Sequence, residues 1–215
     1  MSEHTGTLIL LVRHGTTSTT GTLLPGRASG LHLADAGRAQ AEQVAERLLE
    51  RHAHRPLSAL LTSPLERAVE TATPTAERTG LSLRHEELLL ECDVGEWTGQ
   101  KLADLSRLPE WRTVQSAPSQ FTFPGGESFA DMQNRMVSLV ERLRTEHPGG
   151  TVVCFSHADP IRSLLAHALA GGLDAMQRLS VSPASVSAIE YPKHGDPVVL
   201  LTNSGTRSLA DLTAQ

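Results

Sequence analysis

The sequence of 215 residues is poor in aromatic side chains, in cysteine and in long hydrophobic runs. Phe, Trp and Tyr make up only 3% of the chain, so its core must be mostly aliphatic. The two cysteines, Cys92 and Cys154, lie far apart and form no CxxC pair, which excludes a disulfide framework. No stretch approaches the roughly 20 apolar residues that cross a bilayer, and the run Leu8–Val12 is too short for a signal peptide. We therefore expect a soluble cytoplasmic protein with no membrane partner.

Basic clusters and metal-binding motifs are also lacking. The formal net charge is −5 and no dense block of Lys and Arg occurs, which argues against nucleic acid as a partner. A local pocket on an acidic protein can still be cationic, so a small phosphorylated ligand is compatible with this charge. No HExxH or paired CxxC pattern supports a metal site, and we expect neither a metal nor a cofactor. The sequence leaves the oligomeric state open.

Three short runs are almost continuously apolar, as in parallel strands that are covered on both faces: Leu8–Val12, Leu57–Leu61 and Thr151–Phe155. Helical patterns lie between them, with predicted starts at Asp35, Pro64, the capping box Ser128-x-x-Asp131, and Pro160. Val186–Tyr191 and Pro197–Thr202 predict a hairpin. We expect one α/β domain over residues 1–215, a three-layer sandwich with a mainly parallel sheet, with its core at about 8–203 and a C-terminal tail at 204–215.

Charged side chains follow each predicted strand where it ends. The first strand is followed by Arg13 and His14, the third by His157, and the second leads into "TSPLERA", which contains Arg67. Ligands of such sheets bind beyond the carboxyl ends of the strands. We therefore expect two arginines and two histidines to converge on one edge of the sheet.

Two arginines beside two histidines predict a pocket for a dianion. Guanidinium groups offer paired N–H donors that match phosphoryl oxygens. A neutral imidazole has a free lone pair, so His14 can itself be the nucleophile, and neighbouring cations keep it neutral. The pattern predicts phosphoryl transfer to His14, with Arg13, Arg67 and a protonated His157 stabilising the charge on the phosphoryl oxygens.

Such a reaction needs a proton donor for the departing oxygen, and "LLLECDVGEWTG" offers Glu91, Asp93 and Glu96. Glu91 directly follows the apolar run 88–90. A carboxyl at a strand end beside apolar walls can have its pKa raised and serve as a general acid. As the general acid, Glu91 is favoured over Asp93 by the spacing only slightly.

Several residues admit a simpler interpretation. Asp159 and Arg162, which come soon after His157, are more readily interpreted as the start and surface of a helix than as substrate ligands. Segment 100–123 is irregular and is either a plain connector or a lid over the pocket, and we favour the lid. A cysteine phosphatase needs a cysteine six residues before an arginine; Cys154 lies eight before Arg162, so that alternative fails.

Together the motifs resemble the histidine phosphatase superfamily, in its phosphoglycerate-mutase-like branch. They occur in the family's order: "LVRHGTT", "PGR" with "LADAGRAQA", "TSPLERAVETA", "LLECDVGEWTG", "FPGGES" and "SHADPIRSLLAHAL". The ending "LSVSPASVSAIEY" also resembles a subgroup of actinobacterial proteins described as phosphomutases or phosphatases. The resemblance runs from Leu8 to about Asn203.

The resemblance implies a nucleophilic His14 that forms phosphohistidine, a phosphate pocket of Arg13, Arg67 and His157, and Glu91 as acid and then base. Members commonly carry an asparagine six residues after the nucleophile. Here Thr20 stands at that position, and its hydroxyl can donate to a phosphoryl oxygen with a shorter reach.

We therefore expect a metal-independent phosphomonoesterase that acts through phosphohistidine on a small phosphorylated metabolite. One alternative is a cofactor-dependent phosphoglycerate mutase; another is a catalytically weak domain that binds a phosphorylated ligand for regulation. A mutase needs a second anion site, but the stretch 97–124 offers only Lys101, Arg107 and Arg112 and no tyrosine. A mere binder needs neither His14 nor Glu91.

Overall fold

The computed structural model describes residues 6–205, which are arranged around a six-stranded sheet. Its strands lie in the order β4 (Leu83–His85), β3 (Ala59–Thr62), β6 (Thr151–Ser156), β1 (Thr7–Arg13), β7 (Val186–Tyr191) and β8 (Val198–Ser204). The first four strands are parallel, whereas β7 and β8 form an antiparallel hairpin on the other side of β1. The predicted mainly parallel sheet and the predicted hairpin are both confirmed.

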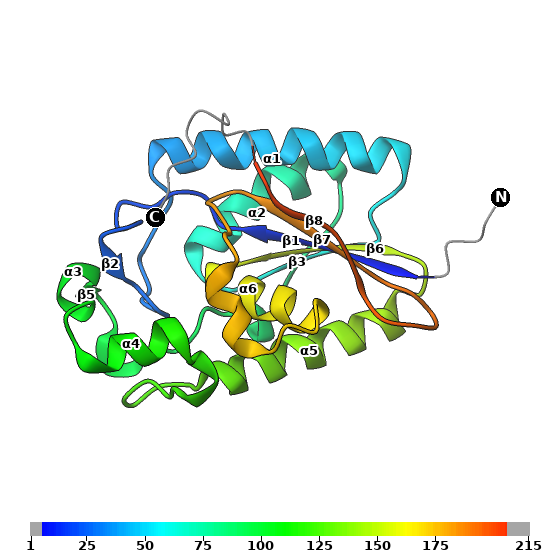
Figure 1. The fold of residues 1–215 in the computed structure, drawn as a ribbon. Coiled ribbons are helices and arrows are strands. Elements are labelled where there is room, and N and C mark those ends of the chain that lie inside the picture. Colours follow the sequence, from blue (N-terminus) through cyan, green and yellow to red (C-terminus); the bar gives the residue numbers. More distant parts are fainter. Residues whose placement is uncertain (1–5, 206–215) are drawn as a thin grey trace.

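Helices cover both faces of this sheet and complete the predicted three layers (Figure 1). Each face carries two of them: α1 (Asp35–His54) and α2 (Glu66–Thr79) on one, α5 (Phe129–Glu146) and α6 (Ala158–Ala168) on the other. Successive side chains of a strand point to opposite faces. Accordingly Leu10 and Val12 of β1 pack on the side of α1, while Ile9 and Leu11 pack on the side of α5.

The N-termini of α1 and α5 differ in their capping. Ser128 accepts a hydrogen bond from the Asp131 N–H at 3.0 Å, so the predicted capping box begins α5. Asp35, by contrast, is the first helical residue of α1 and not its cap. Ala34 precedes it without a side-chain cap, and the Asp35 carboxylate pairs instead with Arg38 one turn later, at 2.7 Å.

Two helices begin at other residues than the prolines predict. α2 begins two residues after Pro64, because Ser63 still donates its N–H to the Phe155 carbonyl at 2.9 Å and keeps the chain extended. α6 begins at Ala158, two residues before Pro160. Pro160 fits in the first turn, where a helix has no partner for the backbone N–H.

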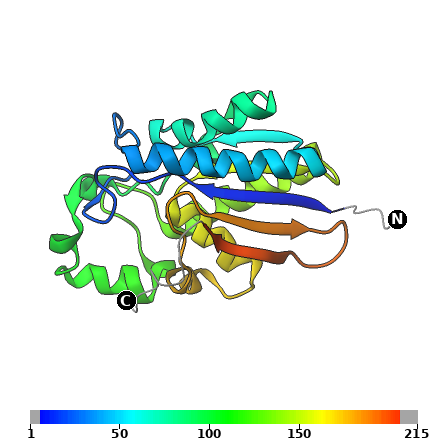
Figure 2. The same ribbon diagram turned by 90° about the horizontal axis from the view of Figure 1, so that it is seen from above.

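Residues 95–123 form a separate layer, called the cover below, beyond the carboxyl ends of the strands (Figures 1 and 2). It contains η2 (Gly95–Trp97), β5 (Gln100–Lys101, paired with β2, Leu23–Leu24), α3 (Leu102–Leu105), α4 (Pro109–Ser116) and η3 (Pro118–Gln120). The expectation that 100–123 is irregular is therefore wrong. Four of the seven aromatic side chains of the protein lie in the cover: Trp97, Trp111, Phe121 and Phe123. They pack against Phe129 of α5, so the cover shares a hydrophobic cluster with that helix.

Two further expectations need correction. The apolar run before Glu91 is a 3₁₀ turn, η1 (Glu87–Leu89), and not a strand. The predicted tail 204–215 begins inside a strand, because β8 continues to Ser204, and residues 206–215 lie outside the described part. The last short element between α6 and β7 is η4 (Leu173–Arg178). Within residues 6–205, no helix combines the length and the apolar character that a membrane span needs.

Candidate active site

The carboxyl ends of β1, β3 and β6 bring the predicted residues together. Arg13 ends β1, Arg67 lies in the first turn of α2 after β3, and His157 follows β6 directly. The His14 N–H donates to the Ser156 carbonyl at 2.9 Å, which extends the pairing of β1 with β6 by one residue. The rings of His14 and His157 consequently meet edge to face, with their centroids 5.2 Å apart.

One ring nitrogen of His14 is hydrogen-bonded to the backbone, and the other keeps its lone pair for nucleophilic attack. Its Nδ1 lies 2.7 Å from the Gly15 carbonyl oxygen, which can only accept, so Nδ1 carries the hydrogen and Nε2 the lone pair. Burial, and then the charges of Arg13 and Arg67, lower the pKa of His14 to about 3. A side chain at Gly15 would place its Cβ 2.7 Å from the Gly37 carbonyl oxygen, so only glycine fits beside this histidine.

Arg13, Arg67 and His157, called the donor cluster below, contain buried nitrogens without a partner in the described residues. One nitrogen of each arginine is fixed by a backbone carbonyl: Arg13 Nη1 by Val181 at 2.6 Å, Arg67 Nη2 by Gly26 at 2.7 Å. The unpartnered nitrogens are Arg13 Nε, Arg67 Nε and Nη1, and His157 Nδ1. Buried donors are costly unless they are bonded, so this arrangement suits an anion with several acceptor oxygens.

His157 differs from its expected protonated state. Its Nε2 lies 2.8 Å from the Ser63 hydroxyl. Burial, followed by the charges of Arg67, His14 and Arg13, lowers the pKa of His157 well below its ordinary value, so the ring is neutral in the free site. When Ser63 donates to Nε2, the ring keeps its own hydrogen on Nδ1, which then serves as a neutral donor in the cluster.

Glu91 lines the same pocket as His14 and Arg13. Burial first, and the neighbouring Asp159 carboxylate second, raise the pKa of Glu91 to about 7. A carboxyl with this pKa carries a proton at neutral pH for part of the time and can donate it. Of the competing candidates, Asp93 accepts from the Gly95 N–H at 3.0 Å and Glu96 is exposed, and neither lines the pocket.

A partly buried ion-pair network behind Glu91 was not found from the sequence. The Glu91 carbonyl accepts from Arg27 at 2.8 Å and from Arg135 at 3.2 Å. Glu127 links the two arginines, at 2.9 Å and 2.7 Å respectively. These residues come from segments up to 108 positions apart, and the motifs "PGR" and "FPGGES" contain Arg27 and Glu127 without indicating that they meet.

Thr20 lines the pocket, and its hydroxyl is already hydrogen-bonded within the loop. Its Oγ1 accepts from the Thr17 N–H at 2.9 Å and lies 3.0 Å from the Thr17 hydroxyl. These bonds close the loop that follows the nucleophile. Binding of a phosphoryl oxygen by Thr20 stays a prediction.

The cover closes a pocket of about 290 Å³ over these residues. Its outer wall is mostly apolar: Leu23, Leu24, Leu102, Trp111, Val114 and Phe123. The bases Lys101, Arg107 and Arg112 of the cover do not line it, whereas Asp159 and Arg162 of α6 do. Asp159 lies in the first turn of α6 and Arg162 one turn later, as expected, and both also reach the pocket. No group of three or more His, Cys, Asp or Glu side chains in residues 6–205 is arranged to hold a metal ion.

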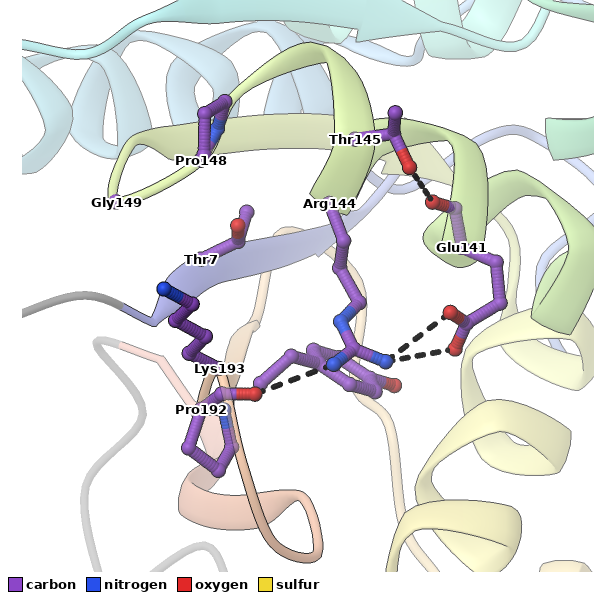
Figure 3. A pocket seen from close by; sticks show the side chains of 9 residues that line it. Thr7, Glu141, Arg144, Thr145, Pro148, Gly149, Pro192 and Lys193 are labelled. Carbon is purple, nitrogen blue, oxygen red and sulfur yellow. Dashed lines mark hydrogen bonds and ion pairs between the residues drawn. The ribbon is translucent and has the colours of Figure 1, made fainter.

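A larger hollow, of about 520 Å³, lies at the other end of β1 and contains none of the predicted site residues (Figure 3). We call it the far hollow. Here Arg144 lies over the Tyr191 ring, donates to both carboxylate oxygens of Glu141 at 2.9 and 3.1 Å, and donates to the Pro192 carbonyl at 3.1 Å. Its guanidinium is therefore already paired.

Known proteins match almost the whole chain. A family model described as "Histidine phosphatase superfamily (branch 1)" matches residues 9–204. Phosphoserine phosphatase 1 of Hydrogenobacter thermophilus is 30% identical over 198 residues, which cover 90% of each protein. Bifunctional protein Rv2228c of Mycobacterium tuberculosis is 33% identical over 200 residues, or 93% of this chain. The chain spans only 54% of that relative's length.

The fold also matches solved structures. The native structure of mycobacterial glucosyl-3-phosphoglycerate phosphatase superposes with a TM-score of 0.82 at 26% sequence identity. The match covers 93% of this chain and 100% of that one. The layered sheet and its helices are therefore shared by proteins that include named phosphatases.

Proposed function

This chain belongs to the histidine phosphatase superfamily, branch 1, and we propose that it hydrolyses a small phosphomonoester through a phosphohistidine at His14. The observation that carries the proposal is a neutral, buried histidine beside the unpartnered donors of the donor cluster. A dianionic phosphoryl group would supply acceptors for these donors. The arginines provide the positive charge, so the reaction as proposed needs no metal ion.

In the first step Nε2 of His14 attacks phosphorus. The P–N bond forms as the P–O ester bond breaks, and the donor cluster stabilises the charge on the phosphoryl oxygens. Protonated Glu91 gives its proton to the departing alcohol oxygen. Because an alkoxide is a poor leaving group, this proton transfer matters most for alkyl esters.

In the second step water attacks the phosphohistidine. Glu91, now a carboxylate, accepts a proton from the water as the new P–O bond forms and the P–N bond breaks. Inorganic phosphate leaves, and both Glu91 and His14 return to their starting states. The pKa of Glu91 near 7 suits both roles, since a group that alternates between acid and base works best near the working pH.

The charge of the pocket favours hydrolysis over a mutase reaction. A mutase holds a bisphosphorylated intermediate and needs cations for the second phosphate. Beyond the donor cluster, the described lining of the pocket offers only Arg162, and the Asp159 carboxylate 3.3 Å from it would repel a second phosphate. The bases of the cover lie elsewhere, as stated above.

The experiment measures both reactions in one assay. The purified protein receives 3-phosphoglycerate with catalytic 2,3-bisphosphoglycerate, in the presence of a chelator, and p-nitrophenyl phosphate in a parallel sample. We expect free phosphate from the aryl ester and no isomerisation that outpaces hydrolysis. Formation of 2-phosphoglycerate faster than free phosphate would support the mutase, and no turnover of any monoester would support a mere binder.

The relatives suggest what kind of molecule to test first. Their names specify phosphoserine and glucosyl-3-phosphoglycerate, which are both phosphomonoesters of small metabolites. We propose a substrate of this class and a cytoplasmic location, with no nucleic-acid or membrane partner. The activity of the longer bifunctional relative as a whole is not transferred to this chain, which spans about half of it.

A further inference from the structure

A carboxylate lines a pocket that is otherwise suited to an anion. Asp159 lies in the first turn of α6, with its side chain 22% exposed, and contributes to the lining next to Arg13 and His14. Its charge opposes a phosphate dianion, and it is one of the groups that raise the pKa of Glu91. A negative charge at this place weakens the binding of every purely anionic substrate. Besides its effect on Glu91, the Asp159 carboxylate offers an acceptor to a substrate that carries a positive charge or hydrogen-bond donors.

The protein itself provides only a long ion pair for the Asp159 carboxylate. Among residues 6–205 its one ion pair is with Arg162, where Nη1 lies 3.3 Å from Oδ1. Tight charge-assisted bonds are about 2.7–2.9 Å long. The nearby pairs of Glu127 with Arg135 and Arg27, at 2.7 and 2.9 Å, reach that range. The Asp159–Arg162 pair is long by comparison, so it holds the Asp159 carboxylate less firmly.

Arg162 also has a free donor. Its Nε is buried and has no partner in the described residues, and its side chain lines the same pocket. Unlike Arg13 and Arg67, it has no backbone carbonyl within residues 6–205 that fixes its guanidinium. Arg162 can therefore donate hydrogen bonds to a substrate carboxylate without losing a short bond to the protein.

Arg13 and Glu91 are the only other Arg, Lys, Asp or Glu side chains of the described lining, and His14 is neutral. The remaining lining is aliphatic, aromatic, hydroxyl or amide, and the amide nitrogen of Gln177 donates to the Val114 carbonyl at 3.1 Å. A leaving group with only a negative charge is repelled by Asp159, and one with only a positive charge leaves Arg162 unmatched. A leaving group with both charges satisfies both residues.

We propose that Asp159 and Arg162 are specificity-determining residues that bind the ammonium and the carboxylate of a small zwitterionic phosphomonoester, a phosphorylated hydroxy amino acid. Its phosphate occupies the donor cluster, and the alcohol that leaves keeps both charges. The inference rests on the phosphatase function proposed above and names its substrate class. The pocket volume of about 290 Å³ agrees with a substrate of this small size.

The test compares substrates that differ by one group. 3-Phosphoglycerate replaces the ammonium of O-phospho-L-serine by a hydroxyl, phosphoethanolamine lacks the carboxylate, and p-nitrophenyl phosphate lacks both. For the unmodified protein we expect kcat/KM for O-phospho-L-serine to exceed that for each of the first two by at least tenfold, which corresponds to about 1.4 kcal/mol. Asp159→Asn should reduce the preference over 3-phosphoglycerate about tenfold, and Arg162→Gln the preference over phosphoethanolamine.

Matched control variants lie on the cover, outside the pocket. Asp104→Asn and Arg112→Gln remove the same charges at exposed positions and should leave both preferences unchanged. If 3-phosphoglycerate is hydrolysed as well as O-phospho-L-serine while p-nitrophenyl phosphate is turned over, the inference is wrong and the phosphatase function stands. If the preferences exist but survive both pocket variants, the assignment of these residues is wrong. If p-nitrophenyl phosphate is not hydrolysed either, both proposals fail.

Discussion

Two hollows lie at opposite ends of β1, and they differ in how their charged groups are paired. At the far hollow, the Arg144 guanidinium is bound by Glu141, by a backbone carbonyl and by the Tyr191 ring. At the active-site pocket, Arg13 and Arg67 keep buried nitrogens without a partner in the described residues. The far hollow is the larger of the two, at about 520 against 290 Å³. Unpaired donors therefore identify the candidate site better than volume does.

The largest difference in activity between the two regions is expected when one arginine is replaced in each. Arg67→Met keeps a similar shape but removes a charge that acts on the transition state, so kcat/KM should fall about 10²–10³-fold. Arg144→Met, its matched control at the far hollow, should leave kcat/KM unchanged. Steady-state kinetics with p-nitrophenyl phosphate, together with melting curves to verify folding, check this. Similar losses in both variants would remove the distinction between the two regions.

A second prediction concerns the leaving group. Glu91→Gln cannot donate a proton, so hydrolysis of an alkyl phosphate should fall about 10²-fold. Hydrolysis of p-nitrophenyl phosphate should fall much less, because its phenolate leaves without a proton. Asp93→Asn, on the next carboxylate along the chain, is the control. Equal losses for both esters, or a larger differential effect at Asp93, would transfer the acid role away from Glu91.

The pH dependence follows from the raised pKa of Glu91. The donor must be protonated, so kcat/KM for an alkyl phosphate should decline as pH rises through about 7, by about fivefold between pH 7 and 8. His14, with a pKa of about 3, should stay neutral over this range and add no step of its own. The profile of Glu91→Gln, which retains the titration of the substrate, is the control. A decline centred near pH 4.5 would show that burial does not raise this pKa.

The smallest effect is expected at the far hollow. Glu141→Gln removes an exposed ion pair with Arg144, and such pairs contribute about 0–1 kcal/mol to stability. We expect a small change in the denaturant midpoint and no change in kcat/KM. A loss of activity here would mean that the two ends of β1 are coupled.

The two regions also differ in how far the sequence could predict them. Arg13, His14 and His157 were found because each follows an apolar strand directly, and parallel strands deliver such residues to one edge. Arg67 was found because it lies in the first turn of the helix that follows the next parallel strand, β3. The position of each residue soon after a predicted strand was enough to predict that these four lie together.

Other features depend on contacts between distant segments. Glu127 and Arg135 support the Glu91 backbone from α5 and the turn before it, and no local pattern marks that contact. The helices of the cover were missed because α3 has only four residues and α4 only eight, which is too short for a helical period to be recognised. Arg162 looked like a helix surface residue, and its approach to the pocket depends on how α6 packs.

The central claim, a covalent bond from His14 to phosphorus, is tested most directly by rapid-quench labelling. The protein is mixed with a radiolabelled phosphomonoester, quenched at alkaline pH within milliseconds and mapped by peptide digestion. The account predicts label on the peptide that contains His14, stable in base and released in acid, as expected for a phosphoramidate. Label on Cys154 or on a serine, or steady turnover without any labelled protein, would contradict it.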